Sequence, residues 1–157
     1  MRYLVQAEID HIVVRQGIYA EAWANYVGFQ PELSIERGNP RTLHWAIPQD
    51  FEIAWTSLDK LGEGNAEILA QYPAYLGQTL RLTGPRATTV SEIARLVTQH
   101  TGRPVDLRLL GREASYGWYD GLAKGEGAVI DPLLGQLLGR PPRGIAEMAD
   151  ELFAYLR

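Results

Sequence analysis

The chain reads Thr-Leu-Arg-Leu-Thr at residues 79–83, where polar and apolar side chains alternate as they do in a half-buried strand. A helix is predicted soon after it, because Thr89 and Glu92 have the spacing of a capping box and Gly102 supplies an ending. A second alternating run, at residues 105–110, predicts another strand. This order of strand, helix and strand indicates an α/β or α+β fold.

Apolar spacing and turn residues predict the remaining elements. The expected strands cover residues 11–15, 42–47 and 51–55, and the expected helices cover residues 18–26, 57–70 and 145–156. Ser57 is the predicted N-cap of the middle helix. Residues 29–41 are expected to form a loop, and residues 111–139 give the weakest pattern.

Composition narrows the class of protein. A length of 157 residues suits one domain, and 46% hydrophobic residues suit a soluble globular chain. The net charge is -4 and the basic residues are scattered, so nucleic acid is not an expected partner. No apolar run reaches the roughly 20 residues of a membrane span, and the start of the chain is not a signal peptide. A cytoplasmic location is therefore expected.

Several motifs that carry chemistry are missing. No Gly-x-Gly-x-x-Gly follows a strand, so the dinucleotide fingerprint is absent, and Gly62 and Gly64 fall inside a predicted helix. The Tyr-x-x-x-Lys pair and the Gly-x-Ser-x-Gly motif are absent too. With no cysteine and three widely spaced histidines, no metal site is expected.

Aromatic side chains form the main candidate for a binding site. Such a set suits a pocket for a flat, apolar small molecule, although for any single residue a place in the core is the favoured interpretation. The candidate substrate-binding residues are Tyr19, Trp23, Tyr26, Trp45, Tyr116, Trp118 and Tyr119. The last three cluster beside glycines in a weakly structured stretch, where they are harder to bury.

Acid–base chemistry has two candidate residues. Glu21 follows a predicted strand-to-helix turn, and ligands of α/β proteins bind beyond the carboxyl ends of strands. His44 alternates with Trp45 on a predicted strand, so one of the two faces outward. Neither residue has a visible partner in the sequence, so a solvated or structural role stays open for both.

Three stretches, together with a fourth near the end of the chain, carry a resemblance to a known family. Residues 11–25 combine a strand ending in Arg-Gln-Gly with a helix carrying an Asn, and residues 54–66 combine a strand with an Asp-containing helix. Residues 82–105 hold Leu-Thr-Gly-Pro, Ser-Glu-Ile-Ala and Thr-Gly-Arg-Pro-Val, and residues 138–143 read Leu-Gly-Arg-Pro-Pro-Arg. Together they resemble the carboxy-terminal portion of NmrA-like proteins, which are atypical short-chain dehydrogenase/reductases.

The resemblance implies a single domain in residues 1–157 that lacks the glycine-rich Rossmann half. Residues 1–72 would be the remnant of the sheet and its helices, and residues 73–157 the substrate-side region. Family members are NAD(P)-binding oxidoreductases or sensors of the nucleotide. Arg15, Gln16 and Gly17 would approach NAD(P) only if a Rossmann half were supplied, so no cofactor is expected to bind this chain alone.

The same resemblance implies a partner. Strand 11–15 would have neighbours on both edges in a complete parallel sheet, and without them its edge is exposed. A homo-oligomer or a partner chain is therefore expected to cover that edge. Three functions stay open: a small-molecule-binding relative of NAD(P)-dependent oxidoreductases, a cofactor-free isomerase, cyclase or dehydratase using Glu21 or His44, and a non-catalytic interaction module.

Overall fold

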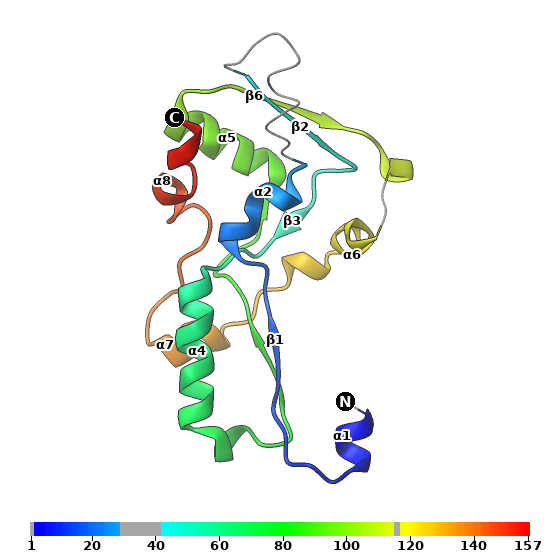
Figure 1. Ribbon diagram of the computed structural model, residues 1–157, viewed down its shortest axis with the longest axis vertical. Helices are drawn as coiled ribbons and strands as arrows, with labels where there is room; N and C mark the ends of the chain where they lie inside the picture. Colours follow the sequence, from blue (N-terminus) through cyan, green and yellow to red (C-terminus); the bar gives the residue numbers. More distant parts are fainter. Residues whose placement is uncertain (1, 29–41, 115–116) are drawn as a thin grey trace.

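The computed structural model describes residues 2–28, 42–114 and 117–157, which form an elongated molecule with the amino terminus at one end (Figure 1). The strands are β1 (Val13–Gln16), β2 (Leu43–Ile47), β3 (Glu52–Ile53), β4 (Thr79–Leu82), β5 (Thr88–Thr89) and β6 (Val105–Leu109). The α-helices are α1 (Arg2–Gln6), α2 (Trp23–Tyr26), α4 (Leu58–Ala70), α5 (Val90–Thr101), α6 (Trp118–Ala123), α7 (Leu133–Leu138) and α8 (Ala149–Leu152). Short 3-10 helices are η1 (Ala20–Ala22), η2 (Tyr72–Tyr75), η3 (Arg112–Ala114), η4 (Glu126–Ala128) and η5 (Ala154–Leu156).

The strands pair in twos. β1 pairs with β4 in parallel, β2 pairs with β6 in parallel, and β3 pairs with β5 antiparallel. Helix and strand are thus mixed as the α/β expectation requires. The two parallel pairs both join strands from either side of residue 72, so the expected division at that residue does not follow the strand pairing.

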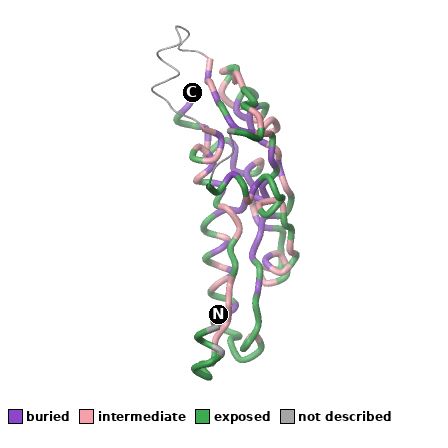
Figure 2. Tube along the Cα trace, turned by 90° about the vertical axis from the view of Figure 1, so that its right-hand side faces the viewer, coloured by how far each residue is buried: buried purple, intermediate pink, exposed green. Residues whose placement is uncertain are grey.

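Two hydrophobic cores hold these pairs. The leucine core packs α4 and α7 against one face of β1 and β4, and its buried members are Leu61, Ile68, Leu80, Leu82 and Leu134. The tryptophan core lies in the other part of the molecule, around β2, β3, α2 and α5, and includes Trp23, Trp45, Trp55, Ile93 and Phe153. Buried segments concentrate in that part, whereas the end near the amino terminus is largely exposed (Figure 2).

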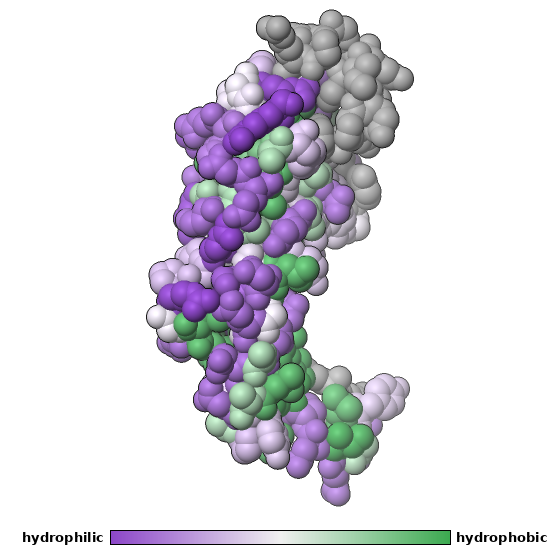
Figure 3. Space-filling view, turned by 60° about the vertical axis from the view of Figure 1, so that its left-hand side comes forward, coloured by the Kyte–Doolittle hydropathy of each residue, from purple (hydrophilic) through white to green (hydrophobic). Residues whose placement is uncertain are grey.

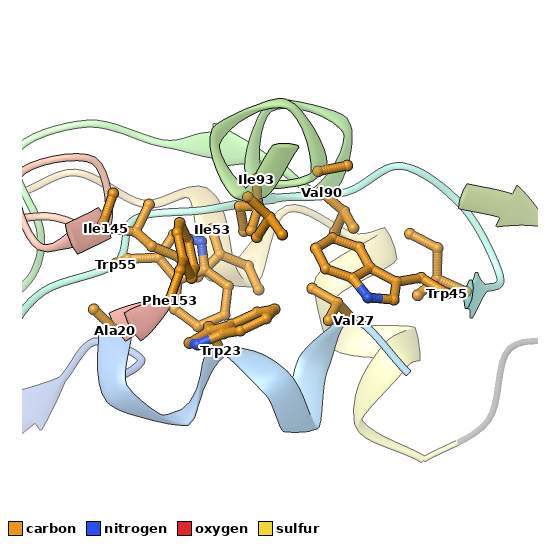
Figure 4. Close-up of a cluster of buried hydrophobic side chains, with 14 of the residues drawn as sticks. Ala20, Trp23, Val27, Trp45, Ile53, Trp55, Val90, Ile93, Ile145 and Phe153 are labelled. Carbon is orange, nitrogen blue, oxygen red and sulfur yellow. The ribbon is translucent and has the colours of Figure 1, made fainter. Parts of the chain in front are cut away.

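Trp23 is central to the tryptophan core. Its ring lies 5.5 Å from that of Trp45 and 5.1 Å from that of Phe153, and all three side chains are at most 1% exposed. Figure 4 shows these rings facing one another between α2, β2 and the carboxy-terminal segment. Three segments distant in sequence are therefore joined through one side chain.

Helix α4 begins where the sequence predicted, but its cap differs. The Ser57 side chain makes no capping hydrogen bond. Instead the backbone N–H of Leu58 donates to both carboxylate oxygens of Glu21, at 3.0 and 3.1 Å. A carboxylate also interacts favourably with the positive end of the helix dipole. Glu21 thus stabilises a helix that starts 37 residues later.

Helix α5 follows the prediction closely. The Thr89 side chain accepts from the Glu92 backbone N–H at 3.1 Å, and Glu92 accepts in return from the Thr89 N–H at 2.9 Å. Gly102 ends the helix with a φ of 71°, in the left-handed region that favours glycine. The predicted capping box and C-cap are confirmed.

Two predicted helices are wrong. Residues 145–156 form turns, the short α8 and η5, although Ile145, Met148 and Leu156 are buried as their spacing suggested. Residues 18–26 start with an isolated parallel bridge between Tyr19 and Thr56, which delays the helix to η1 and α2. The loop expected at residues 29–41 lies outside the described residues.

Within the described ranges, no helix is both long enough and apolar enough to cross a membrane. The same residues contain no group of three or more His, Cys, Asp or Glu side chains placed to hold a metal ion.

Candidate ligand-binding site

A cavity of about 600 Å³ opens where β1 and β4 end. Gln16 and Gly17 line it from the carboxyl end of β1, and Thr83 lines it directly after β4. Because the strands are parallel, their carboxyl ends meet at the same edge, which is where open α/β sheets bind ligands. The cavity therefore occupies the position at which this architecture places a site.

Arginine side chains line the part of the cavity formed by the strands. Arg15 and Arg81 both line it, and both are exposed. Val14, Leu80 and Leu82 belong to the leucine core on the opposite face of the same strands. One face of the β1–β4 pair thus builds the core, and the other face the cavity.

Aromatic rings form another wall. Tyr26, from α2, packs edge to face against Trp118, the first residue of α6, and also against the buried Trp55. Burial, and to a lesser degree the neighbouring Tyr19, raise the pKa of Tyr26 above its ordinary value. Like an ordinary tyrosine hydroxyl, that of Tyr26 is protonated at neutral pH and can donate a hydrogen bond to a ligand.

Hydrogen bonds and close packing hold the remaining walls of the cavity in place. The Ala54 N–H donates to the Gly127 carbonyl at 2.8 Å, which fastens η4 beside β3. The Asp131 N–H donates to Thr83 Oγ1 at 2.8 Å and so ties the segment before α7 to the end of β4. A Cβ on Gly17 would lie 3.3 Å from the Leu82 carbonyl oxygen and the Thr83 Cα, so Gly17 permits close packing of the two strand ends.

The structure brings five of the predicted site residues together. Arg15, Gln16, Gly17, Tyr26 and Trp118 all line the cavity. They come from β1, the turn after it, α2 and α6, and Figure 1 shows α2 and α6 beyond the end of β1.

The other aromatic candidates are placed elsewhere. Trp23 and Trp45 are core residues, each 1% exposed, and Tyr119 is 7% exposed against Phe51. None of these three lines the cavity, so the alternative interpretation as core residues applies to them. Tyr19 is 41% exposed and outside the cavity lining. Tyr116 lies outside the described residues.

Neither acid–base candidate lines the cavity. Glu21 accepts the N-terminal hydrogen bonds of α4, which is a structural role. His44, on β2, pairs through Nδ1 with Asp106 Oδ2 of β6 at 3.0 Å. That hydrogen bond, followed by the nearby Arg108, lowers the pKa of Asp106. The His44–Asp106 pair ties the β2–β6 pair together and lies apart from the cavity lining.

Sequence reasoning missed other lining residues. Arg81, Thr83, Glu126 and Val129 also border the cavity. The alternation at residues 79–83 was the available signal for Arg81, because it placed that side chain on the polar face of the strand. Glu126 and Val129 carried no signal, since they fall in the stretch with the weakest pattern.

Comparison with known proteins gives one curated relative. No family model matches the chain. An NmrA-like family domain-containing oxidoreductase of Aspergillus flavus is 24% identical over 161 residues, which cover 90% of this chain and 49% of the relative. The chain therefore spans about half the length of the curated relative that it matches.

Solved structures show the same fold. A nucleoside-diphosphate-sugar epimerase from Staphylococcus aureus superimposes with a TM-score of 0.71 and 19% identity, covering 95% of this chain and 55% of that chain. An NADPH-dependent quinone oxidoreductase from Escherichia coli, determined with NADPH, superimposes with a TM-score of 0.70 and 21% identity. The match covers 97% of this chain and 56% of that chain.

The parallel pairing and the site at the strand ends thus define an α/β protein of Rossmann-like type. More specifically, the chain is similar in sequence to an NmrA-like family domain-containing oxidoreductase. The resemblance expected from the sequence, to the carboxy-terminal portion of such a protein, is confirmed.

Proposed function

We propose that this chain forms the substrate-binding side of an NAD(P)-dependent oxidoreductase and needs a dinucleotide-binding half to complete the site. The observation that carries the proposal is the cavity at the carboxyl ends of β1 and β4, which joins Gln16 and Gly17 to the aromatic wall of Tyr26 and Trp118. Cavities of a few hundred Å³ with convergent polar groups are typical small-molecule sites.

The described residues suit one end of a dinucleotide. Gln16 and Gly17 line the cavity. By the resemblance to NmrA-like proteins, this turn would approach the nicotinamide ring. A pyrophosphate needs a glycine-rich turn at a helix N-terminus, and the sequence has no such motif. The chain alone is therefore expected not to hold NAD(P).

Hydride chemistry would be supplied by the dinucleotide when it is bound. The residues of this chain would hold and orient the substrate. The Tyr26 hydroxyl, which is protonated at neutral pH as tyrosine hydroxyls ordinarily are, would donate a hydrogen bond to a substrate oxygen. Trp118 would lie against an apolar ring, and Gln16 offers an amide at the strand end.

The free edge of β1 supports the need for a second half. Val13 and Gly17 donate their backbone N–H groups toward β4, to the carbonyls of Gln78 and Leu82. The backbone groups of Val14 and Gln16 therefore point to the other edge, where no described residue pairs with them. An edge strand presents unpaired N–H and C=O groups that can pair with another chain segment, so this edge is the expected contact for an additional strand.

Exposed apolar side chains lie near the amino-terminal end of the molecule. Hydrophobic residues reach the surface around α1 and the lower part of α4 (Figure 3). Large exposed side chains of these segments are Tyr3, Leu4, Ile9, Leu69, Tyr72 and Leu76. They would be buried by a dinucleotide-binding half, whether it is on the same polypeptide or on a partner.

A ligand titration tests the pocket. We expect 2-naphthamide, a neutral bicyclic aromatic amide, to bind this chain, and Trp118→Ala to weaken the binding about tenfold through loss of the stacked ring. Isothermal titration calorimetry measures both. Tyr155→Ala is the matched control, because Tyr155 is exposed and outside the cavity lining. NADPH fluorescence should not change with this chain alone.

Two results would contradict the proposal. If 2-naphthamide binds equally well to the chain and to Trp118→Ala, the aromatic wall is not the site. If NADPH binds saturably to the chain alone, the dinucleotide-binding half is not required.

Light scattering tests the exposed edge. At micromolar concentration we expect this chain to form a homo-oligomer or to associate with a partner chain, because the β1 edge and its apolar neighbours are uncovered. A monodisperse monomer would count against that expectation. Gln16→Pro is a useful comparison, since proline removes the N–H that Gln16 presents at that edge and should shift the protein toward monomer.

A further inference from the structure

Two arginines stand side by side in the cavity. Arg15 and Arg81 are register partners in the parallel β1–β4 pair, so their Cα atoms are direct neighbours across the two strands. Side chains at paired positions project to the same face, and here both line the cavity. The cavity wall therefore presents two adjacent guanidinium groups.

These guanidinium groups form no salt bridge in the described part of the chain. The salt bridges found there involve other basic residues, and neither Arg15 nor Arg81 takes part in one. The acidic residue of the cavity lining is Glu126, on η4, and it is not within ion-pair distance of either arginine. The two neighbouring positive charges are therefore available to attract an anion.

The local charge also differs from that of the whole chain. The protein carries a net charge of -4, whereas the cavity lining holds two arginines and one glutamate. A positive patch in an acidic protein selects anions by attraction in the cavity and repulsion elsewhere. A single guanidinium group can donate two parallel hydrogen bonds to the oxygens of a carboxylate, and a second one beside it adds positive charge.

The aromatic wall of the cavity suits the apolar part of a ligand. Tyr26 and Trp118 present aromatic surface, and Leu122 and Ile18 add aliphatic surface. A ligand that satisfies both walls needs a flat apolar body and an oxyanion at one end.

We infer that the substrate of this site is an aromatic carboxylate, whose carboxylate is bound by Arg15 and Arg81 and whose ring lies against Tyr26 and Trp118. This inference rests on the proposed function, since it names the class of molecule that the proposed pocket accepts.

Matched ligands test the inference separately from the pocket itself. 2-Naphthoate and 2-naphthamide share a ring system and differ in charge, so their affinity ratio isolates the contribution of the arginines. Calorimetry on this chain should give about tenfold tighter binding of the naphthoate, as expected for a charge-assisted bidentate contact. The ratio should fall toward one in Arg15→Gln/Arg81→Gln, while 2-naphthamide still binds.

Arg95→Gln is the matched control, because Arg95 is an exposed arginine on α5 outside this cavity. It should leave the ratio unchanged. Equal binding of the two ligands, or a preference that survives the double substitution, overturns the inference while the pocket proposal stands. Failure of both ligands to bind overturns the inference and the pocket proposal together.

Inorganic pyrophosphate tests whether the two arginines bind the substrate carboxylate or the phosphates of the cofactor. It carries oxyanions without a ring, as the phosphates of a dinucleotide do. Tighter binding of pyrophosphate than of naphthoate, lost in the double arginine variant, would assign the arginines to the cofactor and overturn the substrate class. Weaker binding of pyrophosphate supports the aromatic carboxylate.

Discussion

Trp23→Ala is expected to lower the free energy of unfolding by about 3–5 kcal/mol, the usual cost of removing a buried large aromatic ring. Trp23 is 1% exposed and touches the rings of Trp45 and Phe153, so the substitution leaves a cavity between three segments. Urea denaturation followed by far-ultraviolet circular dichroism measures the change.

Tyr155→Ala is the control for this experiment. Tyr155 is also aromatic, but it is 63% exposed and is not a member of the tryptophan core. It should change the unfolding free energy by less than about 1 kcal/mol, as surface substitutions usually do. Equal effects of the two substitutions would mean that the tryptophan core does not hold these segments together.

Gly84→Ala is expected to cost about 3 kcal/mol or more, at the upper end of the range for overpacked sites. A Cβ at this position would lie 1.9 Å from the carbonyl oxygen of Trp55, and a backbone atom cannot turn aside as a side chain can. The backbone N–H of Gly84 also donates to the Ala54 carbonyl at 3.3 Å, so the two segments would have to separate. Thermal unfolding gives the readout.

Gly62→Ala adds the same methyl group where nothing lies within 4 Å. Because Gly62 lies inside α4, alanine should stabilise the protein by about 1 kcal/mol through its higher helix propensity. If Gly84→Ala were as well tolerated as Gly62→Ala, the close approach of residues 54–55 and 84 would be wrong.

The sequence predicted those elements whose signals are local. Helix α5 carries both its start, in Thr89 and Glu92, and its ending, in Gly102, within its own residues. Residues 145–156 show the limit of apolar spacing as a signal. Ile145, Met148 and Leu156 are buried, but a series of turns buries them as well as a continuous helix would.

Tertiary contacts decided the elements that the sequence missed. The backbone of Tyr19 bridges to Thr56, which keeps the first residues of the expected helix extended. Strand β5 exists because Thr88 and Thr89 pair with Ile53 and Glu52, and a two-residue strand has no periodicity to detect. Neither contact leaves a trace in the local sequence.

The sequence predicted only part of the site, because tertiary contacts also decide which side chains reach the cavity. Gln16 and Gly17 were implied by the resemblance to NmrA-like proteins, and Tyr26 and Trp118 were predicted from their aromatic character. Aromatic character alone did not separate Tyr26 from Trp23, three residues before it, although one lines the cavity and the other is 1% exposed. Only the direction of each side chain on α2 decides between cavity and core.

The hydrogen bonds from Leu58 to Glu21 have a consequence for the order of folding. Their donor and acceptor are 37 residues apart, so the first turn of α4 gains its cap only after the segment that follows β1 has docked. Contacts of such high sequence separation pay the entropy of closing a long loop before they contribute stability. The amino-terminal turn of α4 is therefore expected to become ordered late, together with the strand ends that surround the cavity, so the binding site and this helix end would be completed in the same step.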